Sequence, residues 1–396
     1  MGLIIGTYGS GSSTVSTGWQ RDPNWLPMPT IDPLINIFAG LFLVYEGAVN
    51  ATTIQATNNS LDVDWGDLTS TTTDGTTQLK VYNYASLSGT IYVDEYGRNY
   101  KQVMITLTET GAVTPTQLLI DQALGVASLN STNNYVDIAC SVPNVTDFRV
   151  SGIRPLTLLE RFICYDNSLM LYPSSTFLDA IKLRVLQIDL SVFLTGTSFF
   201  SNSGNITEFN GVKAPFDMSF TNAINLTSTI RNTRIKELGD INILSNCILS
   251  YAIGLNYDLT KIGDVDVSAS TNTSFLFTGN YAIIKINSVD ISSSTTISHV
   301  CAYSPTLTEV HFIGCSNVTV TTNAFIGCNG LEKLTLNGLT VGISLANCSM
   351  GAEAINDLFT SLGTASGSQT ITVTGNPGAG TCNTTIATAK GWTVAT

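Results

Sequence analysis

Aliphatic residues recur with a fixed 24-residue period through the second half of this chain, and this period restricts the possible folds more than any other feature. Leu238, Ile262, Ile286, Val310 and Leu334 form one series, and each has an aliphatic partner three positions earlier. A period of roughly 20–29 residues with L-x-x-L spacing is typical of leucine-rich repeats, whose stacked coils bury equivalent side chains in one interior row. The sequence therefore predicts a β-solenoid.

The same series extends upstream with one irregular 29-residue step, which implies a five-residue insertion before Ile235. A single 24-residue coil has too little apolar surface to fold alone. Stacking such coils about 4.8 Å apart buries a continuous apolar ladder and pairs the strand edges. The upstream members of the series are Leu159/Phe162, Leu183/Leu186 and Ile206/Phe209.

The last part of the chain differs from the other coils. Ile355, Leu358 and Leu362 have helical spacing, and an alternating strand follows at residues 369–373. Terminal repeats must cover the open end of a solenoid. We expect a helix-containing C-terminal cap from about residue 350, so that the solenoid and its cap occupy residues 113–396.

Two further regions precede the solenoid. Residues 36–112 contain short apolar or alternating segments separated by Gly, Asp and Asn turns, which predicts a β-sandwich. Residues 1–35 combine Gly, Ser and closely spaced prolines with Trp19 and Trp25, which predicts an extended N-terminal arm. The two tryptophans either pack on the following domain or dock onto a neighbouring subunit.

Charge excludes some partners. Acidic residues outnumber basic ones by 29 to 17, the formal net charge is −12, and no run of Lys or Arg offsets it locally. A phosphate backbone or an anionic membrane surface would be repelled, so we expect no nucleic-acid binding and no membrane insertion. The longest early apolar stretch, residues 34–45, is too short to span a bilayer as a helix.

The N-terminus lacks the basic and long apolar regions of a signal peptide, so we expect synthesis in a cytosol with the eight cysteines reduced. His299 and His311 are the only histidines, and nucleophile-elbow, zinc-protease, P-loop and dinucleotide motifs are absent from the sequence. We therefore predict no catalytic residue and no cofactor.

Two pairs of aspartates are each separated by one 24-residue period and would face each other in neighbouring coils. The interpretation we favour is solvated carboxylates at strand ends, with no metal. Calcium binding is the first alternative, and a paired-acid glycosidase site is the second. The pairs are Asp240/Asp264 and Asp266/Asp290.

The sandwich region carries a family resemblance. Residues 63–67 read V-D-W-G-D, residues 82–85 read Y-N-Y-A, and residues 97–103 read G-R-N-Y-K-Q-V. This pattern resembles the polycystic-kidney-disease-type (PKD-like) β-sandwich, although Leu68 stands where that family has Gly. The resemblance implies a structural turn at Asp64, Trp65, Gly66 and Asp67, in which the aspartates bond local backbone N–H groups.

One coil resembles a second family. Residues 324–331 fit the A-F-x-x-C-x-x-L segment of leucine-rich repeats in bacterial surface proteins of the BspA type. The other coils keep the period and replace this consensus with Ser, Thr and Asn. The resemblance supports the solenoid and implies a role in surface contact.

The whole pattern resembles structural proteins of bacteriophage particles. The arm reads G-W-Q-R-x-x-x-W-L-P-M-P-T-I at residues 18–31, and the repeat domain ends with V-T-G-N-P-G and K-G-W-T-V. The resemblance implies a non-enzymatic virion protein of a tail, baseplate, fibre or capsid decoration. Its implied partners are other virion proteins, further copies of itself in a homo-oligomer, and a glycan or protein of the host surface.

Two other functions remain open from the sequence. A bacterial cell-surface adhesin would use the same kinds of module, but it would need a secretion signal. A polysaccharide-cleaving tailspike would need paired acids in a groove, and only the stacked aspartates qualify.

Overall fold

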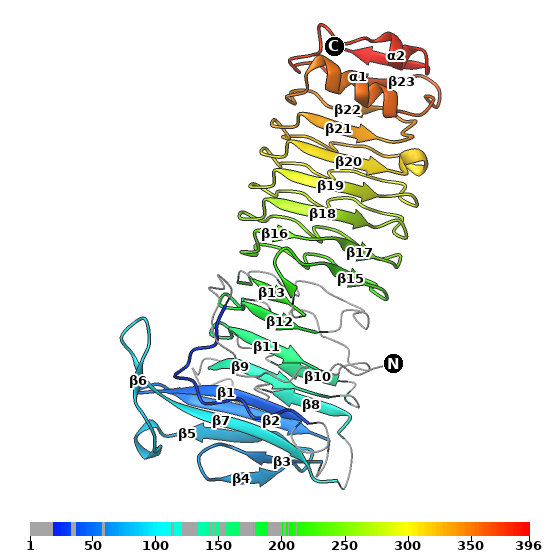
Figure 1. Cartoon of the computed structure of the whole chain (residues 1–396). Coiled ribbons are helices and arrows are strands. Elements are labelled where there is room, and N and C mark those ends of the chain that lie inside the picture. Colours follow the sequence, from blue (N-terminus) through cyan, green and yellow to red (C-terminus); the bar gives the residue numbers. More distant parts are fainter. Residues whose placement is uncertain are drawn as a thin grey trace.

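The computed structural model describes residues 19–32, 37–57, 60–111, 115–120, 134–142, 145, 147–150, 156–165, 177, 179–188, 200, 203–204, 206–210 and 212–396. Residues 1–18 and 33–35 of the predicted arm lie outside the described residues. The described chain is mainly β and forms a rod, with a sandwich at one end and a helix-containing cap at the other (Figure 1). The predicted fold class is confirmed, because about nine turns of β-solenoid follow the sandwich.

The sandwich consists of two facing sheets. In the first sheet, β1, β7, β3 and β4 pair in antiparallel order, and β6 adds to β7. In the facing sheet of the sandwich, β5, β2 and β8 are antiparallel, and β10 pairs with β8 in parallel. The elements are β1 (Phe38–Tyr45), β2 (Asn50–Ala56), β3 (Leu61–Asp64), β4 (Ser70–Thr72), β5 (Gln78–Tyr82), η1 (Tyr84–Ser86), β6 (Tyr92–Val93), β7 (Asn99–Glu109), β8 (Gln117–Ile120) and β10 (Asp147–Val150).

Strand β1 is apolar throughout because both of its faces are buried. Phe42 and Val44 point into the core between the sheets, whereas Leu41 and Leu43 lie in a separate cluster with Trp25 on the outer face. A strand with one solvated face would alternate apolar and polar residues. The apolar run therefore reflects the arm segment that covers the outside of the sheet.

The first sheet continues from the sandwich into the solenoid. Strand β9 (Tyr135–Cys140) pairs with β1 in antiparallel register, and β11 (Arg161–Cys164), β12 (Val185–Gln187) and β13 (Glu208–Phe209) then add in parallel. The predicted boundary at residue 112 falls between β7 and β8, and both sheets run across it. The sandwich therefore closes the N-terminal end of the solenoid, where an open sheet edge would otherwise be exposed.

This ten-stranded sheet ends within the irregular 29-residue step. Strand β14 (Val212–Lys213) folds back antiparallel to β13, and a second sheet begins at β15 (Met218–Phe220). The second sheet is parallel and contains β15, β16 (Glu237–Leu238), β17 (Ile241–Ile243), β18 (Lys261–Asp266), β19 (Lys285–Asp290), β20 (Glu309–Ile313) and β21 (Lys333–Leu336).

The predicted aliphatic row is confirmed in this second sheet. Ile262 pairs with Ile286, and Val310 pairs with Leu334, in the expected register. All five members of the row are at most 2% exposed. Burying each of these side chains contributes about 1.5–3 kcal/mol, which joins successive coils into one core.

A row of buried polar side chains runs beside the aliphatic core. Asn256 Nδ2 donates to Ile230 O (2.9 Å), and Asn280 Nδ2 donates to Ile253 O (2.7 Å). Asn280 Oδ1 in turn accepts the N–H of Asn256 at 3.1 Å. These amides pair main-chain groups that would otherwise be buried without partners. Equivalent positions in the neighbouring coils are Thr233 and Ser304.

The predicted C-terminal cap contains helix α1 (Ala352–Ser361), whose Ile355, Leu358 and Phe359 are buried. Lys390 Nζ donates to carbonyls at the end of α1, including Thr360 O and Leu362 O at 2.6 Å each. A cation at a helix C-terminus pairs the unbonded carbonyls there and favours the helix dipole. The remaining elements are η3 (Cys315–Asn317), β22 (Ile343–Ser344), β23 (Gln369–Thr372), α2 (Thr385–Thr388) and β24 (Trp392–Ala395).

Candidate functional site

The coils share an unusual backbone feature on the side that follows each strand of the second sheet, which we call the turn side (residues 271–281 and their equivalents). In five coils of the described chain, two residues there, four positions apart, adopt the left-handed conformation with φ between 50° and 75°, and in a sixth coil only the first of the two does. The first column is Ser228, Tyr251, Phe275, His299, Asn323 and Asn347, and the second is Asn232, Leu255, Gly279, Tyr303 and Gly327.

Bulky side chains occupy these columns in the middle coils only. The left-handed conformation suits Gly and Asn and costs other residues about 1–2 kcal/mol. Towards either end of the described columns the chain uses Asn, Gly or Ser, but between them it uses Tyr251, Phe275, His299, Leu255 and Tyr303. Strained residues of this kind cluster at functional sites, so we take these coils as the candidate site.

The rings of the first column stack along the solenoid. The centroids of Tyr251 and Phe275 are 5.2 Å apart with planes 25° apart, and those of Phe275 and His299 are 4.7 Å apart with planes 7° apart. Asn323 Nδ2 lies 3.2 Å from His299 Nε2 and extends the column. Aromatic pairs contribute about 0.5–1.5 kcal/mol each, an amount comparable to the backbone strain.

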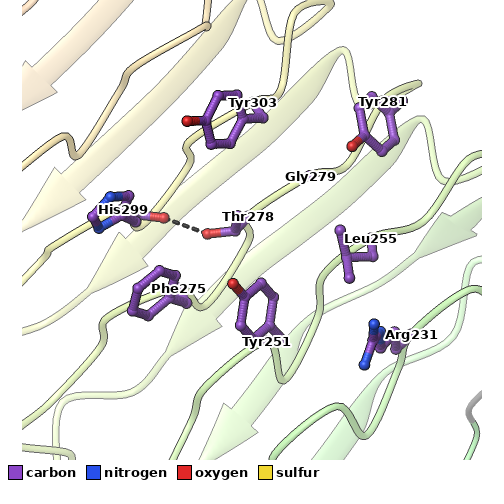
Figure 2. Close-up of a pocket in the computed structure, with 9 residues that line it drawn as sticks. All are labelled: Arg231, Tyr251, Leu255, Phe275, Thr278, Gly279, Tyr281, His299 and Tyr303. Atoms are coloured by element: carbon purple, nitrogen blue, oxygen red, sulfur yellow. Dashed lines mark hydrogen bonds between the residues drawn. The ribbon is translucent and has the colours of Figure 1, made fainter.

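A hollow lies beside this stack, where Gly279 stands between Leu255 and Tyr303 in the second column (Figure 2). A Cβ at Gly279 would lie 2.5 Å from Leu255 Cδ2, so the Leu255 side chain covers this glycine. The indentation measures about 320 Å³, and we call it the aromatic hollow. Its lining residues are Arg231, Tyr251, Leu255, Phe275, Thr278, Gly279, Tyr281, His299 and Tyr303.

The aromatic hollow contains one permanent cation. Arg231 lies at its edge, and no carboxylate is among the lining residues. Within the described part of the chain, Arg231 Nε is buried without a hydrogen-bond partner and no carboxylate forms an ion pair with this guanidinium. The chain as a whole carries a net charge of −12. Arg231 makes this surface a local exception that favours a negatively charged ligand.

A second hollow of about 560 Å³ adjoins the first and shares Phe275 with it. Apolar atoms, including those of the exposed Ile224 and Ile248, make up most of its surface; we call it the polar hollow after the amide and hydroxyl groups that line the rest. Asn246 Oδ1 accepts the N–H of Thr271 at 3.2 Å. The polar lining side chains are Asn246, Ser250, Thr271, Asn272 and Ser274.

Main-chain bonds between coils hold both hollows in shape. The N–H of Phe275 donates to Ser298 O (3.0 Å), the N–H of His299 donates to Thr322 O (3.0 Å), and Thr278 Oγ1 also donates to His299 O. The main chain of the turn side is therefore held by hydrogen bonds between coils, and the hollows are largely preformed.

The structure places the predicted arm tryptophans against their own chain. Trp25 is 8% exposed, and Trp19 Nε1 donates to Glu160 Oε2 (2.8 Å). Between them, Arg21 pairs with Asp137 Oδ2 at 2.7 Å, and Asp137, which is 0% exposed, also pairs with Arg161. This packing corresponds to the first of the two alternatives for the tryptophans, and residues 19–26 are thus part of the fold.

The V-D-W-G-D segment forms a tight turn. Asp64 Oδ1 accepts the N–H of Gly66 (2.8 Å), and Asp67 Oδ1 accepts the N–H of Thr69 (3.3 Å). Burial alone would raise the pKa of Asp67, but hydrogen bonds from Lys80 and Thr69 lower it. Trp65 is buried, and its Nε1 donates to Thr71 Oγ1 at 3.0 Å.

Leu68 adopts a left-handed backbone conformation, which favours glycine. Its φ is 70°, and its side chain is fully exposed. Position 66 requires glycine more strictly, because a Cβ on Gly66 would lie 2.5 Å from Met104 O. The sequence departure at Leu68 therefore leaves the left-handed step of the turn in place.

The four stacked aspartates are bonded to neighbouring groups. Asp240 Oδ1 accepts the N–H of Asp264 (2.8 Å), and Asp264 Oδ1 accepts Ser288 Oγ–H (2.8 Å) in the next coil. A Cβ on Gly263 would lie 2.4 Å from Asp240 Oδ1, so this contact requires glycine. Asp266 and Asp290 cap the N–H groups of Ser268 and Ser292 within their own coils. The described residues contain no group of three or more His, Cys, Asp or Glu side chains that could hold a metal ion.

Sequence reasoning missed the aromatic hollow, although a signal for it was present. Tyr251, Phe275 and His299 follow the 24-residue period, as do Tyr257 and Tyr281, whose rings also stack at 4.9 Å. A search for the period among aromatic residues would have found the Tyr251–Phe275–His299 stack and the Tyr257–Tyr281 pair. The left-handed backbone and the hollow itself required the structure.

No family model, curated protein or solved structure matches the chain. Over the residues that the structure describes, no helix has the length and apolarity needed to cross a membrane.

Proposed function

We propose that this chain is a non-enzymatic structural component of a bacteriophage particle, in a tail, baseplate, fibre or capsid decoration. It docks through its N-terminal part and presents the solenoid to other proteins or to the host surface. The observation that carries the proposal is the ten-stranded sheet that joins the sandwich to the first solenoid coils. Because described strands of both parts pair in one sheet, the base and the rod are held together by main-chain hydrogen bonds, which suits a protein that holds a surface at a fixed distance.

Closed ends support the same role. The sandwich covers one end of the solenoid, and α1 with β22–β24 covers the other (Figure 1). Strand β9 pairs with β1 of the sandwich, and α1 packs on β21, so both covers protect the ends of the solenoid sheets from uncontrolled association. The lateral faces are then the surfaces that remain for contact.

The bonding of the aspartates supports a non-catalytic role. A glycosidase needs one carboxyl group free to donate a proton and another free to act as base or nucleophile. Asp240 and Asp264 instead each accept a hydrogen bond from the next coil. Their place in the structure is that of coil-to-coil connectors.

The test is to purify phage particles made with the full chain and particles made with a chain shortened to residues 19–396. The amount of the chain in each kind of particle is then measured by mass spectrometry. The shortened chain keeps the Arg21–Asp137 pair and the Trp25 cluster intact. We expect the full chain in the particle at a stoichiometric copy number, and the shortened one folded but not incorporated. Absence from particles, with recovery on the bacterial cell surface, would replace the virion proposal by the adhesin.

A further inference from the structure

We propose that the aromatic hollow and the adjoining polar hollow together bind an acidic oligosaccharide, with Arg231 as the carboxylate-binding residue. The inference deepens the proposed function by naming the ligand class of the lateral surface. Its test uses the purified chain, so that loss of glycan binding and absence from a particle are separate results.

The stack of rings favours an oxygen-rich ligand. Both faces of Phe275 are covered by Tyr251 and His299, so the stack presents ring edges to solvent. Ring edges carry partial positive charge and attract electronegative atoms. Tyr281 and Tyr303, whose residues are 41% and 52% exposed, add phenol hydroxyl donors around the same hollow.

Among oxygen-rich ligands, Arg231 favours those that carry a negative charge. Arg231 is the only ionised side chain of permanent charge in the lining; its Nε is buried and unpaired among the described residues, so its terminal Nη groups are the ones that would meet a ligand. A guanidinium binds a carboxylate through two parallel hydrogen bonds. A uronic or sialic acid supplies such a carboxylate on a ring that also has apolar C–H groups, which can pack against Leu255.

The two hollows fit neighbouring sugar units of one polymer. They meet at Phe275, and the Nδ2 groups of Asn246 and Asn272 in the polar hollow remain to donate to sugar hydroxyls, since the amide oxygens of both residues already accept hydrogen bonds within the turn side. Volumes of about 320 and 560 Å³ lie within the usual range of ligand sites, and at the low end for the first. An extended chain therefore fits this surface better than a single small anion.

An acidic peptide fits less well. Extended peptides are usually bound by main-chain hydrogen bonds to a free strand edge. On the turn side, the N–H groups of Phe275, His299 and Gly279 already donate to the next coil. A peptide could therefore contact these hollows through side chains alone.

The experiment is isothermal titration of the full chain with α-1,4-tetragalacturonate, with α-2,8-tetrasialic acid and with a hexaglutamate peptide. The matched neutral ligand is α-1,4-galactotetraose, which has the same rings and linkage as tetragalacturonate but lacks carboxylates. We expect at least one acidic oligosaccharide to bind at about 1 mM or below and to weaken with added salt. The neutral ligand should bind at least tenfold more weakly.

Five variants locate the site. Arg231→Gln should weaken the acidic ligand at least tenfold, because a hydrogen-bonded charge contact contributes about that much. Arg231→Lys should restore part of the affinity, and Arg234→Gln, which changes a 74%-exposed cation outside the hollow, should have no effect. Tyr303→Ala should weaken acidic and neutral ligands alike, whereas Tyr96→Ala on the sandwich should not.

Clear outcomes overturn the proposal. Failure of both acidic oligosaccharides to bind at about 1 mM would overturn it, and hexaglutamate binding as tightly as the oligosaccharides would overturn it too. Wild-type affinity in an Arg231→Gln variant that thermal melting shows to be folded would also overturn it.

Discussion

The buried amide row gives the sharpest test of how the coils are joined. Asn280 is 0% exposed, and its side chain makes four hydrogen bonds. Two of its partners, the N–H of Asn256 and Ile253 O, have no other hydrogen bond among the described residues. Asn280→Ala would leave both groups buried and unpaired.

The magnitude follows from these two groups. Each unpaired buried group costs about 1–3 kcal/mol, so the variant should lose roughly 4 kcal/mol of unfolding free energy. The matched control is Ser304→Ala in the next coil, whose Oγ makes a long bond of 3.4 Å to Phe277 O. That carbonyl keeps Asn280 Nδ2 at 3.0 Å, so the control should lose about 1 kcal/mol or less.

Hydrogen exchange followed by mass spectrometry is the right assay, because coils of a solenoid can open locally without global unfolding. The peptide that contains Asn256 should exchange about 1000-fold faster in Asn280→Ala, which is the rate equivalent of roughly 4 kcal/mol. Urea unfolding followed by circular dichroism provides the global value. Similar exchange in Asn280→Ala and Ser304→Ala would refute the role of the amide row.

Three other properties can be measured on the same protein. Ile286→Ala should lose about 3 kcal/mol in urea unfolding, against about 0.5 kcal/mol or less for the 51%-exposed Ile284→Ala, and equal losses would contradict the interior row. Asp264→Asn keeps an acceptor for Ser288, so its melting temperature should shift equally in calcium and in chelator; a shift confined to calcium would reveal a metal site. Burial raises the pKa of the Cys315 thiol to about 12, which keeps it protonated and unreactive at neutral pH. Of the eight thiols, the native protein should therefore expose only the partly buried Cys382 to Ellman's reagent, and several fast-reacting thiols would contradict the packing.

The periodic part of the fold was readable from sequence because its cause is periodic. Leu238 and Ile262 face the same interior row, so the hydrophobic requirement repeats at every coil. The helix of the cap was readable for a similar reason, since Ile355 and Leu358 lie on one buried face. In both cases one local pattern determined one local structure.

Other features depended on contacts between distant segments. The apolar run of β1 indicates that both of its faces are buried but does not identify Trp25 as the residue on the outer face, and the pair of Arg21 with Asp137 joins residues 116 positions apart. The continuation of both sheets past residue 112 depends on β8 and β9 pairing back to β2 and β1. Such pairings are determined by tertiary packing, which a single sequence does not display.

The candidate site combines both kinds of information. The 24-residue period places Tyr251, Phe275 and His299 in one column, but their left-handed backbone decides that the rings stack on the turn side instead of entering the core. Asn323 and Asn347 occupy the same column with a backbone that suits them, so the aromatic residues are not needed to build the coil. The aliphatic row and the amide row already join the coils. The solenoid therefore does not need the strained backbone of these aromatic residues for its essential contacts. Their position on an open lateral face, around an arginine without a counter-ion in the described chain, is best explained by a ligand.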